Sequence, residues 1–126
     1  MEEHEVYPAI GSEGFKRLIG AFYRRVPNDE VLGPMYASHD LEGAEQRLRG
    51  FLIFRFGGPA DYIAQRGHPR LGMRHGRFHI GDQARRHWLK LMDEAFQDAQ
   101  LPPDAEQVLR NFFENTAAFL RNRPGD

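Results

Sequence analysis

The sequence predicts an all-α fold, and three observations support this prediction. Apolar residues recur every three or four positions along most of the chain, which is the spacing of one buried helix face. No segment alternates apolar and polar residues in the way that is typical of a half-buried strand. A glycine-rich segment at 67–81 interrupts the helical pattern. Compact helical domains rarely keep such a segment without a function, so we expect it to wrap a group that is not protein.

The two long helices of the N-terminal half have recognisable start and stop signals. Ser12 is placed to cap a helix that Pro27 ends, because the residue before a proline leaves the α region. Residues 28–39 are a broken connection with room for one helical turn. Asp40 is placed to cap the next helix, which the stretch "GGP" at 57–59 ends. The apolar faces of these helices are Phe15, Leu18, Ile19, Phe22, Tyr23 and Val26, then Leu41, Ala44, Leu48, Phe51 and Leu52.

Two more helices are expected in the C-terminal half. Asp82 is placed to cap the first, and the stretch "LPPD" at 101–104 ends it. A proline at the start of the last helix is tolerated. Residues 1–126 are expected to form one domain with short tails. The apolar faces are Ala84, Trp88, Leu91, Met92, Ala95 and Phe96, then Val108, Leu109, Phe112, Phe113 and Leu120.

Composition excludes several classes of protein. The chain has no cysteine, so it has no disulfide, no thiolate nucleophile and no cysteine-ligated zinc or iron–sulfur site. Its formal net charge of −1 argues against a general nucleic-acid binder. The acidic N-terminus lacks the apolar core of a signal peptide, and no apolar run approaches the length of a membrane span. We therefore expect a cytoplasmic protein with neither nucleic acid nor membrane as a partner.

The six histidines are the candidate metal ligands, and His68, His75 and His79 lie in the glycine-rich segment. The other three, His4, His39 and His87, are expected to face solvent. His75 and His79 are four residues apart, as in some zinc sites, but zinc needs three or four protein ligands and the HExxH pattern is absent.

Haem fits the surroundings of His75 better than zinc does. Haem needs one axial histidine, a large apolar slot, and cations at its edge for the two propionates. Arg74 and Arg77 would repel a dication but suit that edge, and apolar residues lie close by. The rival interpretation is a surface histidine in a loop that binds a partner protein, within a helical interaction module that has no cofactor.

Three polar aromatic residues, Tyr23, Tyr36 and Trp88, have two interpretations. Tyr23 and Trp88 lie on apolar helix faces, where they could be ordinary core residues whose polar atoms find backbone carbonyls. In a haem pocket they gain a joint role, because phenol and indole donors stabilise the partial negative charge of bound O2 in a dry site. The inward candidates of the helix from Asp40 are Ala44 and Leu48, so it offers no histidine there.

The chain resembles the truncated haemoglobins of group II. The resemblance covers about residues 6–120 and rests on five segments that occur in the family's order and spacing. It implies a 2-on-2 helical sandwich around haem b, in which most of the helix before the proximal histidine is replaced by loop. The segments are "FYRRVPNDEVLGPMY" (22–36), "DLEGAEQRLRGFL" (40–52), "FGGPADY" (56–62), "RGHPRLGMRHGRFHIG" (66–81) and "RRHWLKLM" (85–92).

The resemblance also implies roles for particular residues. The proximal iron ligand falls on His75, and the distal aromatic residues fall on Tyr23, Tyr36 and Trp88. Ala44 stands where myoglobin-like globins have histidine. One departure is Arg77, where family members often have proline. The further candidates for haem contact are Ala44, Arg47, Leu48, Phe51, Tyr62, His68, Leu71, Met73, Arg74, Phe78, Ile80, Met92 and Phe119, of which Arg47, Tyr62, His68 and Arg74 are candidates for the propionates.

The function expected on this basis is binding of O2, CO and NO at a haem iron. Hydrogen bonds to the bound gas would slow its release, which suits nitric oxide dioxygenation or peroxide reduction better than bulk oxygen storage. No flavin or nicotinamide motif is present in the sequence, so such chemistry would need a separate electron donor. The sequence leaves open whether the chain forms a homo-oligomer.

Overall fold

The structure is a computed structural model of the chain, and it describes residues 1–36, 40–60 and 81–120, with side chains up to Asn115. Within these ranges every regular element is a helix, which confirms the predicted fold class. The elements are a 3₁₀ helix Glu3–Glu5, α1 Val6–Arg25, a 3₁₀ helix Val26–Asn28, α2 Leu32–Tyr36, α3 Leu41–Arg55, α6 Asp82–Ala99 and α7 Pro103–Leu120.

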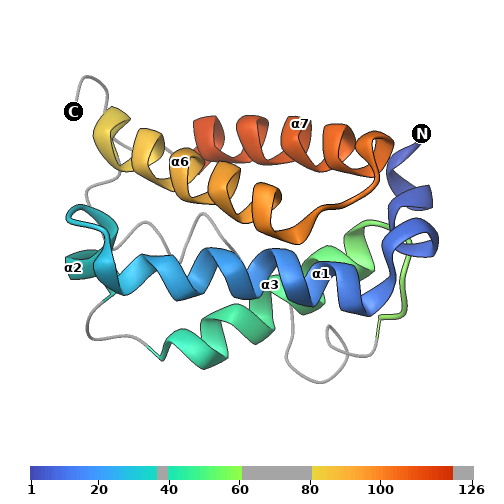
Figure 1. The fold of residues 1–126 in the computed structure, drawn as a ribbon, viewed down its shortest axis with the longest axis horizontal. Coiled ribbons are helices and arrows are strands. Elements are labelled where there is room, and N and C mark those ends of the chain that lie inside the picture. The colour runs from blue at the N-terminus through green and yellow to red at the C-terminus, as the bar shows by residue number, and fades with distance from the viewer. Residues whose placement is uncertain (37–39, 61–80, 121–126) are drawn as a thin grey trace.

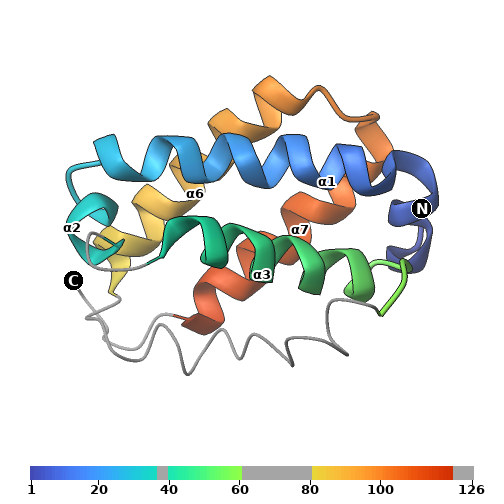
Figure 2. The same cartoon turned by 90° about the horizontal axis from the view of Figure 1, so that it is seen from below.

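The four long helices form two layers of two (Figure 1). One layer contains α1 and α3, which pack against each other, and the other contains α6 and α7. The view from below places the α1 and α3 layer in front of the other (Figure 2). The layers meet mainly where α1 packs on α6, and α2 contacts α6 beside that seam. This is the two-on-two arrangement.

Helix α1 begins earlier than the sequence predicted. It starts at Val6, and Gly11, with φ 67° and ψ −179°, breaks the helical geometry inside it. The expected start at Ser12 is therefore the start of the second part only. The first part is held by packing, since Val6 is fully buried and the amide of Tyr7 donates to the carbonyl of Phe56 at 3.0 Å.

Helix α3 begins and ends where the sequence signals placed it. The carboxylate of Asp40 accepts the amide hydrogen bond of Gly43 at 3.0 Å, which is an N-cap interaction. After Arg55, Gly57 adopts φ 103°, and the amide of Gly58 donates to the carbonyl of Ile53 at 2.7 Å. A Cβ at Gly57 would collide with the carbonyl oxygen of His4, so this turn also seats the N-terminal segment.

Helix α6 differs from the prediction by one residue at its N-cap, and α7 begins as predicted. Gly81, and not Asp82, is the N-cap of α6. The helix ends at Ala99, and its C-cap Gln100 adopts the left-handed conformation with φ 51°. Pro103 is the first residue of α7, which agrees with the prediction that a proline can begin this helix.

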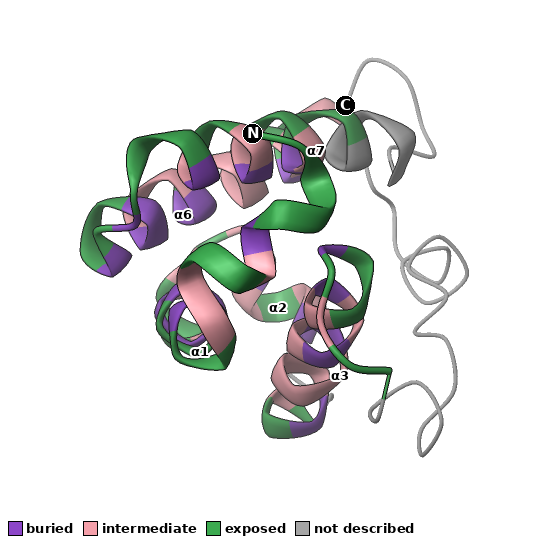
Figure 3. Ribbon diagram, turned by 90° about the vertical axis from the view of Figure 1, so that its right-hand side faces the viewer, coloured by how far each residue is buried: buried purple, intermediate pink, exposed green. Residues whose placement is uncertain are grey.

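The core is apolar and rich in phenylalanine. Buried positions gather where the helices face one another (Figure 3). Phe56 contacts Phe15 and Phe112 at centroid distances of 6.3 and 5.1 Å, and Phe96 contacts Phe113 at 6.0 Å. The contact between Phe56 and Phe112 joins the two layers, whereas the other two lie within a layer. Among the described helices, none has the length and apolar composition that a bilayer crossing needs.

Candidate functional site

Two tyrosines from different helices meet in the interior. Tyr23 lies near the end of α1 and Tyr36 is the last residue of α2. Their rings stand edge to face, with centroids 6.3 Å apart and an interplanar angle of 90°. Tyr36 follows the broken connection, where a residue interpreted without a pocket would be expected at the surface, but it is only 7% exposed and belongs to the core.

Burial keeps both hydroxyl groups protonated. Burial is the largest cause that raises the pKa of Tyr23 well above 10.0; Tyr36 and Glu45 raise it further, while Arg47 lowers it. Burial likewise raises the pKa of Tyr36 to about 12. Both side chains are therefore neutral phenols at physiological pH, and each can donate a hydrogen bond to a group placed beside it.

Trp88 joins the tyrosines through Phe22. Its ring lies 5.1 Å from that of Phe22, and Phe22 in turn lies 5.1 Å from Tyr23 at an angle of 88°. On its other side Trp88 contacts Phe113 at 5.5 Å. We call Phe22, Tyr23, Tyr36 and Trp88 the aromatic cluster. The structure thus brings together the three polar aromatic residues that the sequence singled out.

One face of α3 lies beside the aromatic cluster. Ala44, Arg47, Leu48 and Phe51 are spaced by three or four residues and so share a face of the helix. Leu48 is 6% exposed and the other three are half-buried. Arg47 is close enough to Tyr23 to lower the pKa of its hydroxyl against the effect of burial. The face therefore offers apolar surface together with one cation.

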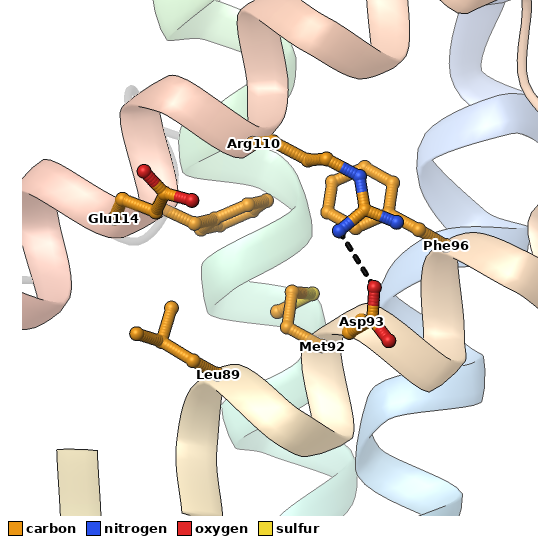
Figure 4. A pocket seen from close by; sticks show the side chains of 7 residues that line it. Leu89, Met92, Asp93, Phe96, Arg110 and Glu114 are labelled. Carbon is orange, nitrogen blue, oxygen red and sulfur yellow. Dashed lines mark hydrogen bonds and ion pairs between the residues drawn. The ribbon is translucent and has the colours of Figure 1, made fainter. Parts of the chain in front are cut away.

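A groove between α6 and α7 lies next to this region but has a different character (Figure 4). Its volume is about 240 Å³. Arg110 of α7 donates to Asp93 of α6 at 2.8 Å and lies 4.5 Å above the ring of Phe96. These polar groups satisfy one another across the groove. The lining residues are Leu89, Met92, Asp93, Phe96, Arg110, Phe113 and Glu114, which places Met92, an expected haem contact, at this groove.

Sequence reasoning missed a pair that joins α6 to the start of α2. His87 was expected to face solvent, but its side chain is 20% exposed, and Nδ1 lies 3.0 Å from Oδ2 of Asp29. The Asp29 carboxylate is 5% exposed. Burial on its own would raise the pKa of Asp29, but hydrogen bonds from the amides of Leu32 and Val31 and from His87 lower it below 3.8. Asp29, three residues before α2, is a recognisable cap signal in the sequence. No nearby residue in the sequence indicates that its partner is His87.

Comparison with known proteins places this arrangement in a family. The sequence model of the bacterial-like globins matches residues 5–122. Over 123 residues the chain is 33% identical to a group 2 truncated haemoglobin 3-1 of Lotus japonicus, covering 95% of this chain and 73% of that protein. The chain belongs to the truncated haemoglobins of group II.

Solved structures of related haemoglobins have the same fold. A thermostable haemoglobin from Thermobifida fusca is 45% identical, with a TM-score of 0.85 over 93% of this chain and 96% of that one. A truncated oxygen-avid haemoglobin from Bacillus subtilis is 33% identical, with a TM-score of 0.84 over 93% of this chain and 98% of that one. The 2-on-2 sandwich that the resemblance implied is confirmed.

The proximal half of the expected site in this truncated haemoglobin lies outside the described residues. The candidate iron ligand, His75, belongs to that segment, as does His79, on which the zinc alternative depended. Within residues 1–36, 40–60 and 81–115, no three side chains of the metal-binding types gather around one point. The other expected contacts in the segment are Tyr62, His68, Leu71, Met73, Arg74, Phe78 and Ile80.

The described residues fit a haem in two respects. The aromatic cluster and the α3 face combine apolar surface with neutral hydrogen-bond donors, which suits a porphyrin and a small gas. In the first turn of α6, Nε of Arg85 is buried and has no hydrogen-bond partner among the described residues. A buried donor without a partner costs roughly 1–3 kcal/mol, and more when it is charged, so the site favours an acidic group beside Arg85. The propionates of a haem are such groups.

Proposed function

We propose that this truncated haemoglobin binds haem b through His75 and holds O2 and other diatomic gases against the aromatic cluster. The observation that supports this most directly is the aromatic cluster itself: Tyr23 and Trp88 both contact Phe22, and Tyr36 contacts Tyr23, so three side chains that carry a donor come together from three elements. The relative from Bacillus subtilis is described as oxygen-avid, which supports O2 as a ligand.

Each side of the proposed site has its own task. Bound haem supplies an iron that takes diatomic ligands. On the proximal side, His75 would hold the iron through Nε2, and donation from its Nδ1–H to a backbone carbonyl would fix the tautomer. At the haem edge, Arg47 and Arg85 from the described helices, with Tyr62, His68 and Arg74, would hold the propionates.

The distal residues act on the gas by hydrogen bonding. The phenols of Tyr23 and Tyr36 keep their protons, since burial raises the pKa of each, so both can donate a hydrogen bond to the gas. The indole Nε1–H of Trp88 can only donate. Ala44 and Leu48 on the facing helix have no polar side-chain atoms. A gas with partial negative charge is therefore retained, while a neutral one is held mainly by packing.

Retention of the gas favours chemistry over delivery. One net hydrogen bond of about 1 kcal/mol slows escape roughly fivefold, and several donors multiply the effect. We therefore propose nitric oxide dioxygenation or peroxide reduction rather than bulk oxygen storage. Either reaction consumes electrons, so a separate electron donor is part of the proposal.

Absorption spectra test the haem assignment. Protein supplied with haem is measured in its ferric, dithionite-reduced and CO-bound forms. We expect a sharp Soret band that shifts when CO is added to the reduced protein. A protein that takes up no haem would overturn the proposal and favour the helical interaction module without a cofactor.

Histidine variants test which side chain holds the iron. His75→Gly should abolish tight haem binding, because the iron loses its axial ligand. His68→Gly and His79→Gly are matched controls from the same segment, and both should retain the Soret band. If His75→Gly keeps the wild-type spectrum while His68→Gly or His79→Gly loses the Soret band, the iron ligand is the histidine whose replacement removes that band.

A further inference from the structure

Asp29 is the residue that organises the short helix α2. Its Oδ1 accepts hydrogen bonds from the amides of Val31 at 2.9 Å and Leu32 at 2.7 Å. Its backbone carbonyl accepts a third, from the amide of Gly33 at 2.9 Å. Helix α2 has five residues, which is too short to be stable through its own hydrogen bonds. Its position therefore depends on Asp29 and on packing.

His87 is the side chain that holds Asp29 in place from another helix. Nδ1 of His87 lies 3.0 Å from Oδ2 and 3.1 Å from Oδ1 of Asp29, across 58 positions of sequence. Both side chains are largely withdrawn from solvent, at 20% and 5% exposed. Such a shielded pair loses less to screening than a surface ion pair does. On α6 itself, the nearest charged neighbours in sequence are Arg86 and Lys90, which are exposed, and Arg85, which is half-buried with a buried Nε.

The two residues of the His87–Asp29 pair are close in sequence to elements that carry the polar aromatic residues Trp88 and Tyr36. His87 precedes Trp88 in α6, and α2 begins beside Asp29 and ends at Tyr36. The pair therefore ties the turn that carries Trp88 to the helix that carries Tyr36. Packing alone can place the ring of Tyr36. The direction of its hydroxyl depends in addition on the position of the C-terminal end of α2, because Tyr36 is the last residue of that helix.

We infer that His87 is a positioning residue for the distal site: through Asp29 it fixes α2, and so sets the place of Tyr36 relative to Trp88. It does not touch the gas. The part of the inference that concerns gas binding rests on the proposed function, while the part that concerns α2 does not.

Amide hydrogen exchange in the full chain tests the structural step. His87→Phe removes the Nδ1 donor but keeps a ring of similar size. We expect exchange at Val31 and Leu32 to accelerate about tenfold or more, which is the factor that a charge-assisted hydrogen bond supplies at the weak end of its range. His87→Asn keeps a donor near the position of Nδ1 and should restore most of the protection.

Arg110→Gln is the matched control. Arg110 also makes a 2.8 Å ion pair with α6, to Asp93, but on the side that faces α7. Its loss should lower stability without selectively exposing Val31 and Leu32. If Arg110→Gln and His87→Phe accelerate these two amides equally, His87 has only a general role in stability, and the inference is wrong.

Oxygen dissociation tests the functional step in the haem-loaded protein. His87→Phe should speed O2 release about twofold to fivefold, up to the effect of losing one net hydrogen bond. Adding Tyr36→Phe to His87→Phe should then change the rate little, because both act through the same donor. Additive effects would overturn the route through Tyr36.

The outcomes separate this inference from the proposed function. A chain that binds no haem overturns the proposed function, and the exchange data still decide whether His87 fixes α2. A chain that binds haem, but in which His87→Phe leaves both Leu32 exchange and O2 release unchanged, overturns the inference alone. If His87→Phe does not fold, Asp29→Asn, which keeps the amide acceptor and loses the charge, takes its place in both measurements.

Discussion

Replacing Trp88 with phenylalanine should speed O2 release without disturbing the surrounding packing. The indole contacts Phe22 at 5.1 Å and Phe113 at 5.5 Å, and a phenyl ring at the same position can keep both aromatic contacts. The substitution removes the Nε1–H donor and part of the ring volume, and the control below tests the effect of altered packing. A net hydrogen bond of about 1 kcal/mol corresponds to a roughly fivefold faster release, and one to a partly charged acceptor, at about 1.5–3 kcal/mol, to roughly 10–150-fold.

The assay is the O2 dissociation rate, measured by stopped-flow displacement with CO in the haem-loaded protein. Phe113→Leu is the matched control, because it disturbs the same side of Trp88 but removes no hydrogen-bond donor. We expect the control to stay within about twofold of wild type. If Trp88→Phe leaves the rate unchanged, or if Phe113→Leu changes it equally, then Trp88 acts by packing and the donor role is refuted.

Two other predictions concern stability. Because the pKa of Asp29 is lowered in the folded protein, its carboxylate stabilises the fold above pH about 3.8, and that stability is lost as pH falls through the folded pKa. In urea unfolding, the gap between wild type and Asp29→Asn should be constant at neutral pH and shrink below about pH 4; a gap that widens in acid would contradict the assignment. Gly57→Ala should lower the free energy of unfolding by about 2 kcal/mol or more, since φ 103° is strained for alanine and the new Cβ meets the His4 carbonyl. Gly11→Ala, with φ 67° and open space, should cost less, and equal losses would mean that the contact with His4 is unimportant.

Local signals in the sequence predicted most of the helix boundaries. The cap at Asp40 and the stop at Gly57 lie where they were expected, because a side-chain cap and a left-handed glycine act within three or four residues. The start of α1 at Val6 was missed. Gly11 breaks the pattern there, and the earlier turn is held by a hydrogen bond from Tyr7 to Phe56, which is distant in sequence.

The candidate site was predicted only in part, because it too depends on contacts between residues that are distant in sequence. Helical spacing placed Tyr23 and Trp88 on apolar faces, but spacing alone could not bring them together with Tyr36, which lies on a separate short helix. The family resemblance supplied that grouping. The pairing of His87 with Asp29 could not be predicted, because its two halves lie 58 positions apart and each has an ordinary local interpretation, a polar helix face and a cap.

The three donors lie on three different helices, and this links the helix packing of the protein to the gas binding that we propose for it. Tyr23 belongs to α1, Tyr36 to α2 and Trp88 to α6, so their separation is set by how these helices pack. Phe22 touches both Tyr23 and Trp88 and is fully buried, while the Asp29–His87 pair fastens α2 to α6. Small changes in helix packing therefore move the donors relative to one another. Variants at the seam between α1 and α6 should alter O2 release in proportion to the displacement of these three side chains, and not in proportion to the stability they lose.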